Sequence, residues 1–263
     1  YGVYVTGNDV IIENTFFKSC HTGISTWSSS QNSDLDVDNC YFLQNDKGIV
    51  LDTVYDSTID DCIFSGNDDG GIWIVEGHDN TIDGSLFVSG GAGIYIDTDS
   101  NENVINDCDF EDLYQTGYTT GVYIDGGYLN EIYDSEFDHC LWGVKIIGDG
   151  SVNKVENCDF IDDEDLEDDV GIYCEALNFP TYLYENDFYN LSRAIHLAGA
   201  KFVFINGDSS SHSMIFQCAY VLYAEPLNGV GCESGQMTYY NLSHGAGNTM
   251  EIYLEGASSS STT

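Results

Sequence analysis

Acidic side chains recur along this chain at a spacing that could hold cations. Asp38, Asp60 and Asp83 follow one another at intervals of 22 and 23 residues, and each comes directly after a Val or an Ile. If these positions stack at the spacing of neighbouring β-strands, about 4.8 Å, the carboxylates repel one another by roughly 1 kcal/mol per pair in water. Calcium, other cations or high salt would relieve that repulsion. The series predicts either a cation ladder, with stability that rises with calcium or salt, or a solvated acidic face.

Aromatic side chains form a second series with a similar period. Each occupies the third position of a phrase of the form Gly-Ile/Val-x-Ile/Cys, at Trp73, Tyr95, Tyr123 and Tyr173. In a strand this position points away from its two apolar neighbours and toward solvent. Exposed aromatic stripes are more often contact surfaces than accidents of sequence. We expect the stripe to contact sugar rings or a neighbouring subunit, and the residue types do not distinguish the two.

Of the nine cysteines, eight fall into two sets and Cys174 lies outside both. One set shares a column that alternation turns inward, where a thiol acts as a small buried hydrophobe. Its members are Cys40, Cys62, Cys108 and Cys158. The candidates for disulfides within or between chains lie elsewhere, at Cys20, Cys140, Cys218 and Cys232. Because nine is an odd number, at least one thiol is free or pairs with another chain.

Several features favour an exported chain. Asn190 and Asn241 begin Asn-x-Ser sequons, the form of glycosylation acceptors, and a Ser/Thr-rich tail occupies residues 257–263. The chain begins with Tyr1 rather than Met, which is typical of a processed or trimmed product. The six histidines show no zinc-site spacing with cysteine, so no metal centre of that kind is predicted.

The elements that must position these residues repeat every 21–28 residues. Each unit opens with a Gly-Ile-x-Ile phrase and continues with a phrase of the form Ile-x-Asp/Asn-Cys/Ser-x-Phe. The opening glycines are Gly2, Gly23, Gly48, Gly71, Gly93, Gly121, Gly143 and Gly171. Two short alternating segments in a unit of this length predict stacked strands with one buried face, on which the Ile and Phe columns point inward. A helix is a poor alternative, because no segment keeps a helical period.

Two further columns support the stacking. Two residues after the Ile, seven of eight units have Asn, Asp or Gly, which tolerate the left-handed backbone of a tight corner. Two residues before the Ile, consecutive units have Asn80, Asn103, Asn130 and Asn153. Their amides are predicted to bond one another along the stack, as Asn ladders do.

These phrases resemble the repeat of the right-handed parallel β-helix family, clearly over residues 2–205 and loosely over 206–263. The resemblance implies an all-β solenoid, here of about ten coils. It implies little about activity, because the family includes pectate lyases, polygalacturonases, uronan epimerases, phage tailspikes and surface proteins. The acidity, aromatic content and cysteines also resemble, more weakly, archaeal or bacterial surface-layer and sheath proteins.

The catalytic residues that this resemblance would imply are not assembled in the sequence. Lyases of this fold are expected to use a Lys or Arg base beside calcium, but the six basic residues are scattered. Asp60-Asp61 is present, whereas the Asn-Thr-Asp and Arg-x-Lys phrases of polygalacturonase-like hydrolases and the Asp-Pro-His phrase of uronan epimerases are absent. Paired carboxylates could hydrolyse a neutral glycan, yet among 45 acids a pair carries little information. We interpret the chain as non-catalytic, with a polysaccharide-acting enzyme as the alternative.

The charge of the chain limits its partners. Asp and Glu number 45 against six Lys and Arg, which gives a formal net charge of −39. This field repels nucleic acid, and it repels pectin, alginate and other polyanions unless metal ions intervene. No membrane insertion is predicted, since no apolar run reaches the length of a span. No cofactor is predicted, apart from calcium or another cation.

We predict one domain, with residues 1–205 as regular coils, residues 206–256 as irregular coils of the same domain, and residues 257–263 as a tail. Neither end shows a clear capping repeat, so we predict a homopolymer assembled head-to-tail. The predicted function is a non-catalytic structural subunit of an extracellular surface layer, sheath or filament at the cell surface. The alternative is a carbohydrate-active or carbohydrate-binding β-helix protein, a glycan hydrolase or tailspike-like protein, that uses the aromatic stripe.

Overall fold

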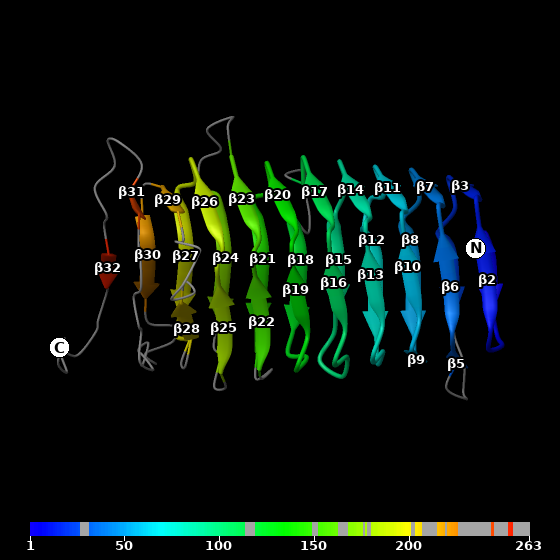
Figure 1. The fold of residues 1–263 in the computed structure, drawn as a ribbon. Helices are drawn as coiled ribbons and strands as arrows, with labels where there is room; N and C mark the ends of the chain where they lie inside the picture. The colour runs from blue at the N-terminus through cyan, green and yellow to red at the C-terminus, as the bar shows by residue number, and fades with distance from the viewer. Residues whose placement is uncertain are drawn as a thin grey trace.

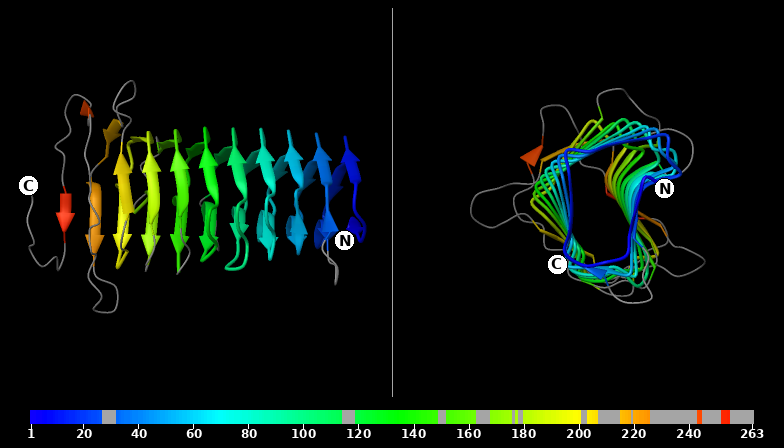
Figure 2. Two further views of the ribbon diagram at one scale, coloured as in Figure 1. Left: turned by 60° about the horizontal axis from the view of Figure 1, so that its bottom comes forward. Right: turned by 90° about the vertical axis from the view of Figure 1, so that its right-hand side faces the viewer.

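The computed structural model confirms an all-β parallel solenoid. It describes residues 1–26, 32–113, 119–148, 152–162, 168–175, 177, 180–200, 203–206, 215–218, 220–225, 243–244 and 252–254. The strands stack along one axis (Figure 1), and the view down that axis in Figure 2 shows the coils superimposed around a common interior. Within the described ranges, no helix has the length and apolar character needed to cross a membrane.

Three long parallel sheets, named A, B and C, form the walls of the solenoid. Sheet A contains β1 (Val3–Val5), β4 (Thr22–Thr26), β8 (Lys47–Asp52), β12 (Gly70–Val75), β15 (Ala92–Ile96), β18 (Thr120–Asp125), β21 (Trp142–Ile147), β24 (Val170–Glu175), β27 (Arg193–Ala198), β30 (Tyr220–Glu225) and β32 (Ile252–Leu254). Sheet B contains β2 (Val10–Glu13), β6 (Leu35–Asp38), β10 (Thr58–Asp60), β13 (Thr81–Asp83), β16 (Val104–Asn106), β19 (Glu131–Tyr133), β22 (Asn153–Glu156), β25 (Thr181–Tyr184) and β28 (Val203–Asn206). Sheet C contains β3 (Phe16–Lys18), β7 (Tyr41–Leu43), β11 (Ile63–Ser65), β14 (Leu86–Val88), β17 (Asp109–Glu111), β20 (Glu136–Asp138), β23 (Asp159–Ile161), β26 (Asp187–Tyr189), β29 (Ile215–Gln217) and β31 (Ser243–His244). A short pair, β5 (Asn32–Ser33) and β9 (Val54–Tyr55), lies at one corner.

Each strand pairs with the equivalent strand of the next coil. Ile59 lies opposite Ile82, for example, and Phe64 lies opposite Phe87. The predicted fold class is therefore confirmed, and the described strands of sheets A, B and C number 11, 9 and 10, against the about ten coils expected from the sequence. The predicted division at residues 205 and 256 stays a prediction, because most later residues lie outside the described ranges.

The corner between sheets B and C has a left-handed backbone in each of the first eight coils. The corner residue has a φ between 47° and 54° in all of them. These residues are Asn14, Asn39, Asp61, Gly84, Asp107, Asp134, Asn157 and Glu185. Asn, Asp and Gly enter this region at low cost, which explains why they recur here, as the residue types predicted.

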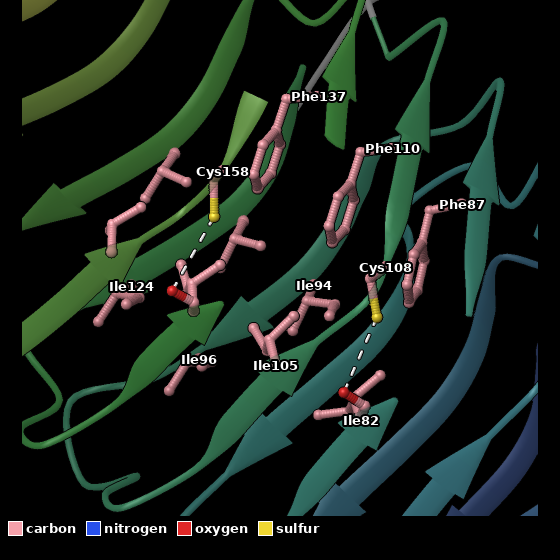
Figure 3. Close-up of a cluster of buried hydrophobic side chains, with 14 of the residues drawn as sticks. Ile82, Phe87, Ile94, Ile96, Ile105, Cys108, Phe110, Ile124, Phe137 and Cys158 are labelled. Carbon is pink, nitrogen blue, oxygen red and sulfur yellow. Dashed lines mark hydrogen bonds between the residues drawn. The ribbon is translucent and has the colours of Figure 1, made fainter. Parts of the chain in front are cut away.

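The core consists of the predicted Phe and Ile columns. Neighbouring Phe rings from Phe17 to Phe188 have centroids 4.7–5.0 Å apart and planes within 9° of each other. Figure 3 shows Phe87, Phe110 and Phe137 in this row, beside the isoleucines that line the other walls. The second column is fully buried at Ile59, Ile82, Ile105, Ile132 and Val155.

The glycine that opens each unit is required by this ring stack. A Cβ atom on Gly121 would lie 2.5 Å from Cδ1 of Phe137 and 2.7 Å from the carbonyl oxygen of Gly143. Equivalent contacts of 2.5–2.7 Å recur at the opening glycines from Gly2 to Gly171. No methyl group fits at these distances, so the repeated glycine in the sequence follows from the repeated ring beneath it.

Buried polar groups are paired along the axis. In the predicted Asn ladder, Nδ2 of Asn80 donates to Oδ1 of Asn103 at 3.0 Å, and Asn103 donates in the same way to Asn130 at 3.0 Å. Asn130 continues the ladder to Asn153 at 3.4 Å. Each of these three also donates to a backbone carbonyl of the preceding coil, which satisfies a buried acceptor. The predicted ladder is confirmed.

The inward cysteines also donate hydrogen bonds to backbone carbonyls of a preceding coil. Sγ of Cys62 donates to the carbonyl of Val37 at 3.6 Å, and Sγ of Cys108 donates to the carbonyl of Ile82 at 3.8 Å (Figure 3). Burial raises the pKa of both thiols to about 12. These thiols are therefore protonated structural groups rather than reactive ones.

Candidate functional site

The aromatic series lies in register on the outward face of sheet A. Trp73 on β12, Tyr95 on β15 and Tyr123 on β18 are direct neighbours across the sheet. Lys145 on β21 takes the equivalent position in the next coil, and Tyr173 on β24 follows it. Figure 1 shows these strands side by side along the axis. All five side chains are half-buried, and we call these five residues the sheet A stripe.

The rings of the sheet A stripe are tilted against one another. The centroids of Trp73 and Tyr95 lie 4.4 Å apart with an interplanar angle of 33°. Those of Tyr95 and Tyr123 lie 5.4 Å apart at 58°. Rings that stack in parallel, as in the core, cover one another's faces, whereas tilted rings leave part of each face and edge open. The stripe therefore leaves part of its aromatic surface open to solvent.

Lys145 is held among aromatic rings. Its Nζ atom lies 4.1 Å from the ring centroid of Trp142, and 5.3 Å from those of Tyr123 and Tyr173. Burial lowers the pKa of Lys145. Contacts of this kind between an ammonium group and ring faces are attractive when partly desolvated, so the lysine has a defined position in the stripe.

Two carboxylates flank the stripe. The hydroxyl of Tyr95 donates to Oδ2 of Asp125 at 3.3 Å, and the hydroxyl of Tyr173 donates to Oε2 of Glu175 at 3.0 Å. Both carboxylates attract the Lys145 ammonium. An ionised carboxylate can accept several hydrogen bonds, so each retains acceptor capacity for hydroxyl groups of a ligand.

The predicted acidic series lies on the outward face of sheet B. Asp38, Asp60 and Asp83 are in register on β6, β10 and β13. The group of oxygens that come within 4.8 Å of one another, however, belongs to Asp38, Asp60 and Asp61. Oδ1 of Asp83 accepts a hydrogen bond from Nδ2 of Asn106 at 2.7 Å instead. A cation at this ladder stays a prediction, now with Asp61 among its candidate ligands.

We expect Asp60→Asn to stabilise the protein at neutral pH. Burial raises the pKa of Asp60, and Asp61, Asp83 and Asp38 add to the rise. The folded state thus binds the Asp60 proton more tightly than the unfolded state does. The contribution of Asp60 to stability is therefore most favourable below the ordinary Asp pKa, and it is lost as the pH rises through the raised pKa. Opposed like charges on a sheet cost roughly 0.2–1 kcal/mol, and denaturant unfolding at pH 7 should show a gain of that size. The variant should also respond less than the wild type to calcium or salt.

Asp36→Asn is the matched control for this substitution. Asp36 lies on the same strand as Asp38, but its neighbours across the sheet are Ile11 and Thr58. Its replacement should change stability by less than about 0.5 kcal/mol. Equal effects of the two substitutions, or a loss of stability in Asp60→Asn, would contradict the electrostatic interpretation.

A second acidic row, which the repeat phrases did not single out, lines a groove of about 310 Å³ beside the corner of sheets B and C. Four of its carboxylates are in register on sheet C, at Asp109, Glu136, Asp159 and Asp187. Burial raises the pKa of Asp109, Glu136 and Asp159, and neighbouring carboxylates raise it further. Each of the four directly precedes a core Phe in the sequence, and that recurrence is the signal that could have located the row.

The predicted disulfides are not supported. Among the described residues, Cys20 and Cys140 carry free thiols and Cys218 is buried, while pairing with another chain stays a prediction. Cys20 and Cys140 share a column but lie in the first and sixth coils, so about five strand spacings separate them, far beyond disulfide reach. Sγ of Cys140 donates instead to the carbonyl of Phe110 at 3.5 Å. Cys232 lies outside the described residues.

Of the two glycosylation candidates, Asn190 lies in the turn after β26 and its side chain is exposed. It is therefore accessible to modification, and its glycosylation stays a prediction. Asn241 lies outside the described residues.

Comparison with known proteins gives one family and several similar folds. The family model described as a right-handed β-helix region matches residues 1–119 and 89–225, which together cover most of the chain. No curated protein sequence matches the chain.

Three of the similar solved structures illustrate the range of proteins with this fold. An alginate lyase from Paenibacillus sp. str. FPU-7 has a TM-score of 0.59 and 13% identity, over 86% of this chain and 92% of the lyase. A mutant tailspike protein of E. coli bacteriophage HK620 in complex with a hexasaccharide has a TM-score of 0.58 and 11% identity, over 84% of this chain and 46% of the tailspike. PfbA, a surface adhesin of Streptococcus pneumoniae, has a TM-score of 0.55 and 15% identity, over 85% of this chain and 62% of the adhesin. At these identities the similarity concerns the fold.

Proposed function

This chain belongs to the right-handed β-helix family, and we propose that it is a carbohydrate-binding member, which holds a glycan against the outward face of sheet A. The observation that carries the proposal is the sheet A stripe, where Trp73, Tyr95 and Tyr123 stand in register in three consecutive coils. Sugar rings have apolar faces that pack on aromatic carbon and hydroxyls that need polar partners. The stripe and its flanking carboxylates supply both kinds of contact along one surface.

The similar folds support a glycan in preference to a purely structural role. The lyase is named for alginate and the tailspike structure contains a hexasaccharide, so two of the three relatives concern carbohydrates. The tailspike and the adhesin also favour an extracellular or cell-surface location for this chain. The structural subunit of a layer, sheath or filament, with head-to-tail self-assembly, stays a prediction with less support. A polysaccharide-acting enzyme, which would cleave the glycan that it binds on sheet A, remains the catalytic form of this proposal.

A glycan array followed by titration calorimetry tests this function. The wild type should bind a subset of glycans, and Tyr95→Ala should weaken that binding about tenfold, a loss of about 1.4 kcal/mol, because it removes the ring between Trp73 and Tyr123. The matched control is Tyr41→Ala, since Tyr41 is a surface tyrosine, exposed at 45%, that lies on sheet C. It should bind as the wild type does.

Two outcomes would overturn the proposal. One is the absence of binding to any glycan on the array by folded wild-type protein. The other is an equal loss of affinity in Tyr95→Ala and Tyr41→Ala, both checked by circular dichroism to be folded. Release of new reducing ends from a bound glycan would instead identify the catalytic form.

A further inference from the structure

We infer that the ligand of the sheet A stripe is an extended, uncharged polysaccharide that lies along the solenoid axis with one sugar residue on each coil. The inference rests on the proposed function and specifies the class and orientation of the ligand. It depends on the direction of the stripe, its spacing and the charges that surround it.

The stripe runs along the axis rather than across it. Its five members occupy equivalent positions on five consecutive strands, β12, β15, β18, β21 and β24 (Figure 1). A chain that crossed the sheet along a strand would contact one member, whereas a chain parallel to the axis contacts all five. In the two preceding coils the same column has Ser25 and Val50, which separate the stripe from Tyr4 in the first coil.

The spacing of the stripe matches a sugar chain. Neighbouring strands lie about 4.8 Å apart, and a pyranose unit in an extended, equatorially linked chain advances by nearly the same length. Successive sugars can therefore meet successive coils without loss of register. A compact or strongly bent glycan would leave the stripe after one or two contacts.

The charges around the stripe favour an uncharged chain. Lys145 is its one basic member, and Glu175 and Asp125 already attract its ammonium. Those carboxylates accept hydrogen bonds from the hydroxyls of Tyr95 and Tyr173. A uronate placed on the stripe would meet these two negative groups as well as the net charge of −39, whereas sugar hydroxyls can donate to the same carboxylates.

Titration calorimetry with oligosaccharides of increasing length tests the inference. The probes are cello-, xylo- and chito-oligosaccharides of two to six sugars, and oligogalacturonates of the same lengths, all in calcium-free buffer. Affinity for at least one neutral series should rise about threefold per added sugar and level off at about five sugars, one for each coil of the stripe. The oligogalacturonates should not bind measurably.

Tyr173→Ala gives a positional readout at the far end of the stripe. It should remove most of the gain in affinity between the neutral trisaccharide and the pentasaccharide, while Tyr41→Ala should retain that gain. Binding without length dependence, or tighter binding of oligogalacturonate than of every neutral series, would overturn the inference and leave the proposed function intact. Failure of every glycan, on the array and in titration, would overturn both.

Discussion

Replacement of Phe110 by alanine should lower the free energy of unfolding by roughly 3–5 kcal/mol. The Phe110 side chain is fully buried. Its ring lies between those of Phe87 and Phe137, with centroid separations of 4.9 and 4.7 Å. The neighbouring coils hold each other in register through their strands, so they cannot collapse into the space left by the ring, and a cavity remains. Guanidinium chloride unfolding at pH 7 measures the loss.

Phe16→Ala is the matched control for this large effect. Phe16 belongs to the same sheet but points outward, and 58% of its surface is exposed. Its replacement should change stability by no more than about 0.5 kcal/mol. A loss below about 1 kcal/mol for Phe110→Ala, or equal losses for the two variants, would show that the stacked Phe rings do not stabilise the core.

The repeated parts of this fold could be predicted from sequence because the same structural requirement selects the same residue type at the equivalent position of each repeat unit. Gly121, Phe137 and the corner residue Asp134 would each be ambiguous alone. Their recurrence in successive units establishes the period, and the period places Phe137 beside Phe110 and Phe160. Stacking the Asn column on the same period places the amides of Asn80 and Asn103 within bonding distance, where the structure has them at 3.0 Å.

The details of the candidate sites depend on geometry that a linear period does not contain. Asp61 reaches Asp38 and Asp60 because the chain bends at this left-handed corner, with a φ of 48°. The position of Lys145 depends on Trp142, which is three residues away in the sequence and still reaches its ammonium. Residue types place these side chains on a surface, but the turn angle and the side-chain torsions decide which of them meet.

Cysteine pairing depends on geometry of the same kind. Cys20 and Cys140 share a column, each three residues after a core Phe, but a column extends along the axis and its members are separated by whole coils. A shared column brings cysteines close only when they occupy adjacent coils. Position along the axis therefore has to be combined with column identity before any cross-link is predicted.

Gly121→Ala should destabilise the protein by about 2 kcal/mol or more, in the upper part of the roughly 1–3 kcal/mol that overpacking costs. The added methyl group would lie 2.5 Å from Cδ1 of Phe137 and 2.7 Å from the carbonyl oxygen of Gly143. The ring cannot move aside easily, because it is stacked between Phe110 and Phe160 at 4.7 and 4.8 Å. The carbonyl belongs to the neighbouring strand of sheet A, which the ladder holds in place. Denaturant unfolding measures the loss.

Two further variants separate this steric cause from a general intolerance of alanine. Gly7→Ala is the control, because a Cβ atom there meets nothing within 4 Å, and its effect should stay below about 0.5 kcal/mol. In a Phe137→Ala background the ring contact is gone, so Gly121→Ala should cost less there than in the wild type, by an interaction energy of roughly 0.5–3 kcal/mol. Strict additivity of the two substitutions would show that the opening glycine is not selected by the ring, and the physical explanation of the sequence repeat would then have to be sought in the carbonyl contact alone.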